Sequence, residues 1–168
     1  MLKWILIGAG GLAALVLLIA LIGALLPAGH RASRRVNLPA SPERVFEVIT
    51  DVGRYAEWRP DVKRVEVLPD SSGGLRFREQ GAHGEVLYRV EESVPPRRWV
   101  TRIDDPSLPY GGSWTYQLAP EAGGTALTIT EDGEVKNPIF RFLSRTVFST
   151  SATIEKYQAA VRERLRAK

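Results

Sequence analysis

The chain has no cysteine and only two histidines among its 168 residues. Without thiols it can form no disulfide, no thiolate nucleophile and no cysteine-ligated zinc or iron–sulfur centre. His30 and His83 are too few for a histidine-rich metal site, and a Ser/His/Asp catalytic arrangement would have to use one of them. We therefore expect no metal and no cofactor.

Charge is almost absent from the first part of the chain. Lys3 is the only charged side chain before Arg31, and the first acidic residue is Glu43. All other members of the 23 Lys and Arg residues follow, against 19 acidic residues, so the charged part is close to balance. Nucleic-acid binders usually gather a much larger basic excess, and we expect no nucleic-acid partner.

The uncharged run from Trp4 to Leu26 is the longest apolar segment. As a helix it would span about 34 Å at about 1.5 Å per residue, which matches a bilayer core of about 30 Å. A cleaved signal peptide is the alternative, but its apolar region normally has about 7–15 residues, and Leu26-Pro27-Ala28 is a poor cleavage site. We predict that residues 1–28 form an N-terminal transmembrane anchor, with about 4–26 spanning.

Basic residues follow the apolar run more densely than they precede it. Arg31, Arg34 and Arg35 lie close to its carboxyl end, against Lys3 and the terminal amine on the other side. The positive-inside rule then predicts a single-pass protein with its soluble domain on the cytoplasmic side, next to membrane lipids. We predict a short basic linker at 29–33 and one domain at 34–168.

The start of this domain has strand and helix signals. Residues 34–38 are predicted to form a short strand, and Ser41 followed by Pro42 is typical of a helix N-terminus. A second short helix is predicted over 55–60, ended by Pro60.

From Val62 onward the apolar residues recur with period two, as in half-buried strands. Short glycine and proline clusters separate the runs, which predicts an antiparallel meander of about six strands. The spacing then returns to three and four residues between Phe140 and Leu165, which predicts one long amphipathic C-terminal helix starting near Asn137-Pro138. An apolar sheet face and an apolar helix face should cover each other.

Several segments resemble the START-like (SRPBCC) superfamily, specifically its polyketide cyclase/dehydrase and lipid-transport branch. The resemblance rests on the segments Ser41–Phe46, Asp51–Pro60, Gly112–Leu118, Gly124-Thr125 and Asn137-Pro138. It implies an α+β helix-grip fold, in which a curved antiparallel sheet of about seven strands wraps around a long C-terminal helix. It also implies a cavity between sheet and helix that holds an apolar ligand. These segments are patterns of fold rather than of catalysis.

Strand and helix alternation indicates which side chains should face this cavity. The candidates for ligand binding are Phe77, Tyr88, Trp99, Trp114, Tyr116, Ile129, Leu143, Val147 and Ile154. As ordinary core residues they would fill the space, while as a set of five aromatics on one sheet they would edge a pocket. The Tyr88 and Tyr116 hydroxyls could orient a ligand, because a buried phenol needs a partner.

Three functions remain open at this point. The favoured one is a membrane-anchored module that holds or presents a hydrophobic ligand, a lipid or a polyketide-like metabolite. The second is a cyclase-like or dehydratase-like enzyme that uses Tyr88, Tyr116 or an inward arginine such as Arg76. The third is a non-catalytic protein-interaction scaffold with a fully packed interior. No residue is assigned a catalytic role.

The remaining polar groups favour surface roles. His83 lies between glycines in a predicted turn. The adjacent pairs Asp104-Asp105 and Glu131-Asp132 should point to opposite faces of a strand, so neither forms a carboxylate dyad. The hydroxyl-rich stretch from Ser144 to Thr153 either thins the last helix to leave room for ligand or lets it bend.

Overall fold

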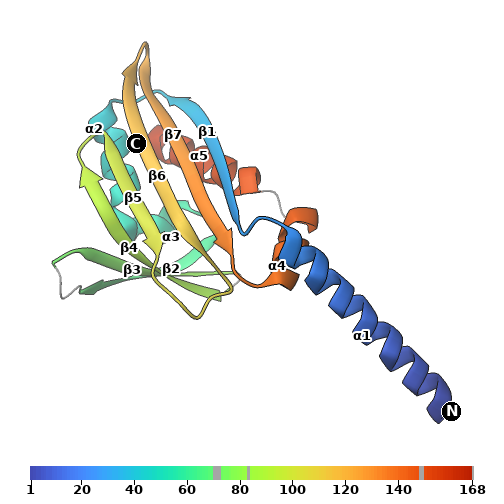
Figure 1. Cartoon of the computed structure of the whole chain (residues 1–168). Coiled ribbons are helices and arrows are strands. Elements are labelled where there is room, and N and C mark those ends of the chain that lie inside the picture. The colour runs from blue at the N-terminus through green and yellow to red at the C-terminus, as the bar shows by residue number, and fades with distance from the viewer. Residues whose placement is uncertain (70–72, 83, 148–149, 168) are drawn as a thin grey trace.

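The computed structural model describes residues 1–69, 73–82, 84–147 and 150–167, and side chains at 2, 5 and 144–151 lie outside the description. A seven-stranded antiparallel sheet forms the body of the protein, and one long helix projects from its end (Figure 1). The elements, in chain order, are α1 (Leu2–Leu25), β1 (Gly29–Leu38), α2 (Pro42–Thr50), the 3-10 helix η1 (Val52–Arg54), α3 (Tyr55–Trp58), β2 (Val62–Pro69), β3 (Leu75–Gly81), β4 (Gly84–Val94), β5 (Arg98–Ile103), β6 (Tyr110–Glu121), β7 (Gly124–Val135), α4 (Pro138–Val147) and α5 (Thr150–Arg166).

The sheet order is β1-β7-β6-β5-β4-β3-β2. Strands β2 to β7 form the predicted meander, and β1 closes the far edge by pairing with β7 from Gly29↔Glu134 to Leu38↔Thr125. The α+β helix-grip fold is therefore confirmed, with a C-terminal helix against the sheet and an apolar helix at the N-terminus.

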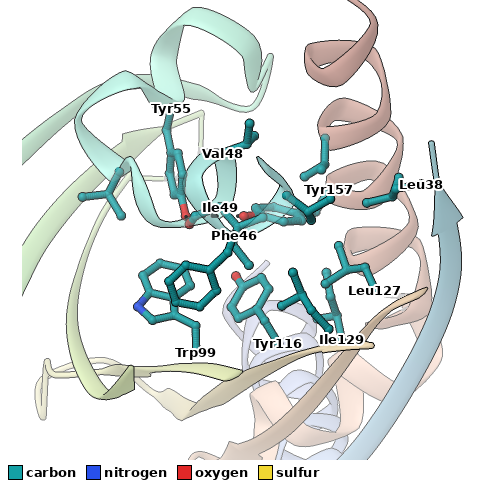
Figure 2. Packing of buried hydrophobic residues seen from close by; sticks show 14 of the residues in the cluster. Leu38, Phe46, Val48, Ile49, Tyr55, Trp99, Tyr116, Leu127, Ile129 and Tyr157 are labelled. Atoms are coloured by element: carbon teal, nitrogen blue, oxygen red, sulfur yellow. Dashed lines mark hydrogen bonds between the residues drawn. The ribbon is translucent and has the colours of Figure 1, made fainter. Parts of the chain in front are cut away.

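Helices α2, α3 and α5 cover one face of the sheet, here called the inner face (Figure 1). Figure 2 shows Trp99, Tyr116 and Ile129 rising from the strands toward Phe46 of α2 and Tyr157 of α5. Gln158 fixes α5 on the sheet, because its buried side-chain amide donates to the carbonyl oxygens of Arg34 and Leu127.

The predicted helix starts are confirmed by their caps. The Ser41 hydroxyl accepts a hydrogen bond from the Arg44 amide, and Pro42 occupies the first helical position. The Asn137 side-chain oxygen accepts from the amides of Ile139 and Phe140 at the start of α4.

Two elements differ from their predicted extents. Strand β1 begins at Gly29, so residues 29–33, predicted as linker, form the first half of β1, because they pair with the end of β7. The predicted single C-terminal helix is divided into α4, which packs beside α1, and α5, which packs on β1, α2 and α3. Most of the hydroxyl-rich stretch from Ser144 to Thr153, predicted either to leave room for ligand or to let the helix bend, lies outside the described residues and side chains.

Helix α1 carries an apolar segment of membrane-spanning length. Its residues 6–25 have a mean hydropathy of 2.6, and 6% of the most apolar window is buried inside the protein. Length and composition therefore fit a membrane span, and they also fit a signal sequence.

Candidate functional site

Aromatic side chains form a continuous row on the inner face, contributed by β3, β4, β5 and β6. Phe77 stacks on Tyr88 and Trp99, with ring centroids 5.3 and 6.4 Å apart. Trp99 contacts Tyr116 at 5.1 Å, and Tyr116 contacts Trp114 at 6.1 Å. The row exists because these residues are cross-strand neighbours: Phe77 pairs with Tyr88, and Trp99 pairs with Tyr116.

Helices α3 and α5 close a second aromatic layer over this row. Tyr157 of α5 lies 5.5 Å from Tyr116 and 5.8 Å from both Trp114 and Trp58, measured between ring centroids. Tyr55, at the start of α3, meets Phe77 edge-on at 6.3 Å. The two layers pack directly against each other through these ring contacts.

A charged pair lies between these layers. Arg59 follows α3, and its Nη1 donates to Glu79 Oε1 on β3 at 2.8 Å, with each side chain only 12% exposed. The guanidinium carbon of Arg59 also lies 4.9 Å from the Tyr55 ring centroid and 5.2 Å from that of Tyr157. Asp61 binds the second guanidinium nitrogen at 2.6 Å from the solvent side.

The environment keeps Arg59 charged and makes Glu79 easier to protonate. Burial opposes the charge on Arg59, but Glu79 and Asp61 outweigh it and hold the pKa of the guanidinium above its ordinary value. Burial raises the pKa of the Glu79 carboxyl, although Arg59 partly offsets that rise. Glu79 is therefore a carboxyl group with an elevated proton affinity inside an aromatic enclosure.

Two tyrosine hydroxyls next to this pair have no partner among the described residues: those of Tyr88 and Tyr116. Tyr55 differs, because its hydroxyl donates to the carbonyl oxygen of Ile49 at 2.6 Å and contacts the Tyr157 hydroxyl at 3.4 Å. Burial raises the pKa of Tyr88 and of Tyr116, so both remain protonated donors at neutral pH.

Tyr88 lies diagonally across the β3–β4 ladder from Glu79, since Phe77 pairs with Tyr88 and Glu79 with Val86. Such diagonal neighbours have Cα atoms about 7–8 Å apart. Arg59, Glu79, Tyr88 and Tyr116 together are here called the polar centre. It offers hydroxyl and carboxyl hydrogen-bonding groups within apolar walls, an arrangement suited to an apolar ligand with one polar group.

A second polar pair lies on the inner face at the end of the sheet nearest α1. His30 Nε2 lies 3.1 Å from Glu131 Oε1, and Glu131 is the cross-strand partner of Trp114. The adjacent Asp132 instead pairs with Arg31 on the outer face. The prediction that neighbouring carboxylates separate to opposite faces therefore holds for Glu131 and Asp132.

Most of the predicted site residues come together on the inner face. The core cluster contains Phe77, Trp99, Tyr116, Ile129 and Ile154, and half-buried Tyr88 and Trp114 pack against it. That these seven side chains contact a ligand stays a prediction.

The other predicted positions lie elsewhere. Leu143 is on α4, 39% exposed and outside the core cluster. The Val147 side chain and all of His83 lie outside the described residues. Arg76, considered as an inward arginine, is on the face opposite its neighbour Phe77, where it pairs with Asp104 at 2.8 Å.

Sequence reasoning did not assign Arg59, Glu79, Tyr55 or Trp58 to the site. Arg59 and Glu79 are 20 residues apart and belong to different elements. The available signal was Glu79 itself, a charged residue two positions after Phe77 and therefore on the same apolar face.

The outer face carries a hollow of about 560 Å³ where β1, β7, β6 and β5 meet. It is lined by charged and small residues, including Arg31, Arg102, Ser113 and Asp132, and it is open to solvent. Within the described part of the chain, no group of three or more His, Asp or Glu residues could hold a metal ion.

Comparison with known proteins identifies the domain. The model of the family described as polyketide cyclase / dehydrase and lipid transport matches residues 29–168. The chain belongs to this family. It is thus a member of the SRPBCC superfamily of hydrophobic-ligand-binding domains, and the matched range begins at the first residue of β1. A comparison with curated proteins found no match.

Solved structures show the same fold. A START superfamily protein from Mycobacterium smegmatis has a TM-score of 0.66 at 20% identity, covering 82% of this chain and 98% of that one. A protein from Thermus thermophilus has a TM-score of 0.66 at 25% identity, covering 83% and 97%. The Zhui aromatase/cyclase from Streptomyces sp. R1128 has a TM-score of 0.64 at 18% identity, covering 81% and 93%.

Proposed function

We propose that this SRPBCC domain is anchored in a membrane by α1 and binds a lipid or lipid-like metabolite whose polar group reaches the polar centre. The observation that carries this proposal is the pair of hydroxyls of Tyr88 and Tyr116, which are enclosed by aromatic rings and have no partner among the described residues. Neither hydroxyl oxygen is among the fully buried side-chain atoms that lack a partner, so water can accept these hydrogen bonds in the unliganded protein. A ligand that accepts hydrogen bonds from both would replace that water.

The walls of the site set the remaining chemistry of the ligand. Half-buried Trp114 offers an aromatic surface that favours an acyl chain or a fused ring system. Phe77 and Trp99 are 2% exposed and already stacked against neighbouring rings, so they form the wall behind it. Arg59 already contacts Glu79 and Asp61, so the centre does not present a free positive charge. A hydroxyl, carbonyl or protonated carboxyl group therefore fits the polar centre better than a second anion.

Retention of α1 is supported by its contacts with the domain. Arg141 of α4 donates to the carbonyl oxygens of Gly23 and Leu26 at 3.3 and 3.1 Å. A removable signal peptide needs no such contacts with the mature domain, whereas a permanent anchor gains from them. With Arg31, Arg34 and Arg35 following the span, the anchor places the domain on the cytoplasmic side.

Native mass spectrometry of the full chain, extracted from membranes in mild detergent, tests this function. We expect the intact mass including α1 and a stoichiometric apolar ligand that solvent extraction releases. An unliganded mass that persists after incubation with lipid vesicles would contradict ligand binding, and a mass beginning after α1 would contradict anchoring. Labelling of an Ala122→Cys variant with a membrane-impermeant thiol reagent, in sealed inside-out and right-side-out vesicles, reports on which side of the membrane the domain lies.

One observation favours a second candidate function, catalysis in the same site. Glu79 has an elevated pKa and lies diagonally from the Tyr88 phenol, and such a carboxyl can exchange a proton with a bound substrate. For a cyclase-like or dehydratase-like enzyme, Glu79→Gln should abolish turnover of the co-purified compound while retaining its binding. Unchanged composition of the bound compound in wild-type and Glu79→Gln protein would favour binding alone.

A further inference from the structure

The last turns of α1 are fixed against α4. Gly23 is buried at this contact, and a side chain there would collide with the backbone carbonyl of Pro138. Ile19 and Ala20, one turn earlier, are half-buried, while most of the rest of α1 is exposed. Figure 1 shows α4 beside the domain end of α1.

Arg141 adds hydrogen bonds at the end of α1. Pro27 has no N–H to donate to the Gly23 carbonyl, which instead accepts from the Leu26 amide at 3.3 Å. Arg141 Nη1 donates to this oxygen and to that of Leu26, while its other nitrogens donate to the carbonyls of Val135 and Lys136. Its positive charge also lies at the negative end of the helix dipole.

These contacts set the depth of α4. Gly23 and Ile19 precede Leu26 by three and seven residues, or about 4–10 Å along the helix at about 1.5 Å per residue. If the apolar run fills the hydrocarbon core of the bilayer and ends at its boundary with Leu26, α4 lies about 4–10 Å inside that boundary. Helices that lie in a membrane interface are buried about 5–10 Å into the boundary between head groups and acyl chains.

Helix α4 has the side chains that such a position requires. Phe140 is 52% exposed and Leu143 39% exposed, although both are large apolar residues. Lys136, just before α4, and Arg141 on it supply positive charge near anionic head groups.

We propose that α4 is an interfacial helix that lies in the lipid bilayer beside α1, with Phe140 and Leu143 among the acyl chains. This inference rests on the proposed anchoring by α1 and adds a defined orientation of the domain. Strand β1 begins and β7 ends next to α4, so the end of the inner face that carries His30 and Glu131 faces the lipid surface. A lipid can then move between the bilayer and the inner face without crossing bulk water.

The absence of cysteine makes a direct depth measurement possible, because single cysteines can be labelled without background. Full-length Phe140→Cys, Leu15→Cys and Ala122→Cys variants carry an NBD fluorophore in vesicles of phosphatidylcholine and phosphatidylglycerol. Residue 15 lies in the middle of α1, and residue 122 in the β6–β7 turn at the other end of the sheet. Quenching by doxyl-labelled lipids reports the depth of each site.

We expect a blue-shifted emission and quenching by shallow doxyl groups at position 140, quenching by deep groups at 15, and neither at 122. Quenching at 15 with position 140 behaving like 122 would overturn the interfacial helix and leave the anchor intact. Loss of quenching at both 15 and 140 would overturn the anchor as well.

A second set of variants tests the connection between the two helices. Gly23→Leu forces α4 away from α1, and Arg141→Met removes the hydrogen bonds to the end of α1. Either change should reduce quenching at 140 while quenching at 15 stays the same. Unchanged quenching at 140 in both variants would show that α4 is not positioned by α1.

Discussion

Arg59 at the end of α3 donates to Glu79 on β3 at 2.8 Å, and this ion pair lies between two layers of aromatic rings. It joins the short helical segment over the sheet to the third strand of the inner face. A charged pair in such surroundings needs both partners, because either charge alone would be buried without compensation.

Arg59→Met should therefore destabilise the fold more than the loss of an exposed ion pair would. We expect the free energy of unfolding to fall by about 3–5 kcal/mol, as for other broken buried pairs. The double variant Arg59→Met/Glu79→Met should recover most of this loss, because no charge is then left unpaired. Urea unfolding of the three proteins checks this, and a double variant no more stable than Arg59→Met would contradict the assignment.

Glu79 should give stability a specific pH dependence. Burial raises its pKa above the ordinary value of 4.5, so the folded state holds the proton more tightly than the unfolded chain. Its contribution to stability is fully present below pH 4.5 and is lost as pH rises through the higher folded pKa. The difference in unfolding free energy between wild type and Glu79→Gln should therefore decrease across this window, and parallel pH profiles would contradict the shift.

Removing the unpartnered hydroxyls should weaken binding and spare the fold. Tyr116→Phe and Tyr88→Phe each remove a donor to the ligand, worth about 0.5–1.5 kcal/mol, or about 2- to 10-fold in the dissociation constant. The melting temperature of the ligand-free protein should stay the same, because neither hydroxyl has a partner among the described residues. The dissociation constant is measured by titration with the fluorescent fatty acid cis-parinaric acid.

Tyr55→Phe is the matched control for these two variants. It also removes one phenol hydroxyl from the aromatic enclosure, but that hydroxyl donates to the Ile49 carbonyl. We expect the opposite result, with about 1–3 kcal/mol of stability lost and little change in affinity for the probe. Equal effects of all three substitutions on affinity would show that the hydroxyls do not differ in role.

Trp114→Ala tests the wall of the site. The half-buried indole contacts Tyr116 and Tyr157 at 6.1 and 5.8 Å between centroids. Its removal should lower the affinity for cis-parinaric acid and destabilise the fold by about 1–3 kcal/mol. If both quantities are unchanged, Trp114 is neither wall nor core.

The sequence predicted the parts of the structure that follow from periodicity. Alternation in β3 to β7 placed Phe77, Trp99, Tyr116 and Ile129 on one face, because a one-residue error would have turned all of them to solvent. Ser41 and Asn137 identified helix starts because their side chains cap free amides.

The features that the sequence did not predict depend on contacts between distant elements. The first half of β1 is a strand because it pairs with β7, about 100 residues away in the chain. Arg59 is part of the site because α3 packs on β2, from where the Arg59 side chain reaches Glu79 on β3. Helix α4 is part of a different contact, with α1. None of these partners can be chosen from local spacing alone.

The central claim is that the polar centre holds the polar group of an apolar ligand. The most direct test compares ligand occupancy in two proteins purified in parallel. Wild type and the Tyr88→Phe/Tyr116→Phe variant are extracted from membranes and compared by native mass spectrometry. We predict a bound apolar compound in wild type and a largely empty variant, whose melting temperature equals that of wild type from which the compound has been extracted. Equal occupancy of the two proteins would contradict the claim.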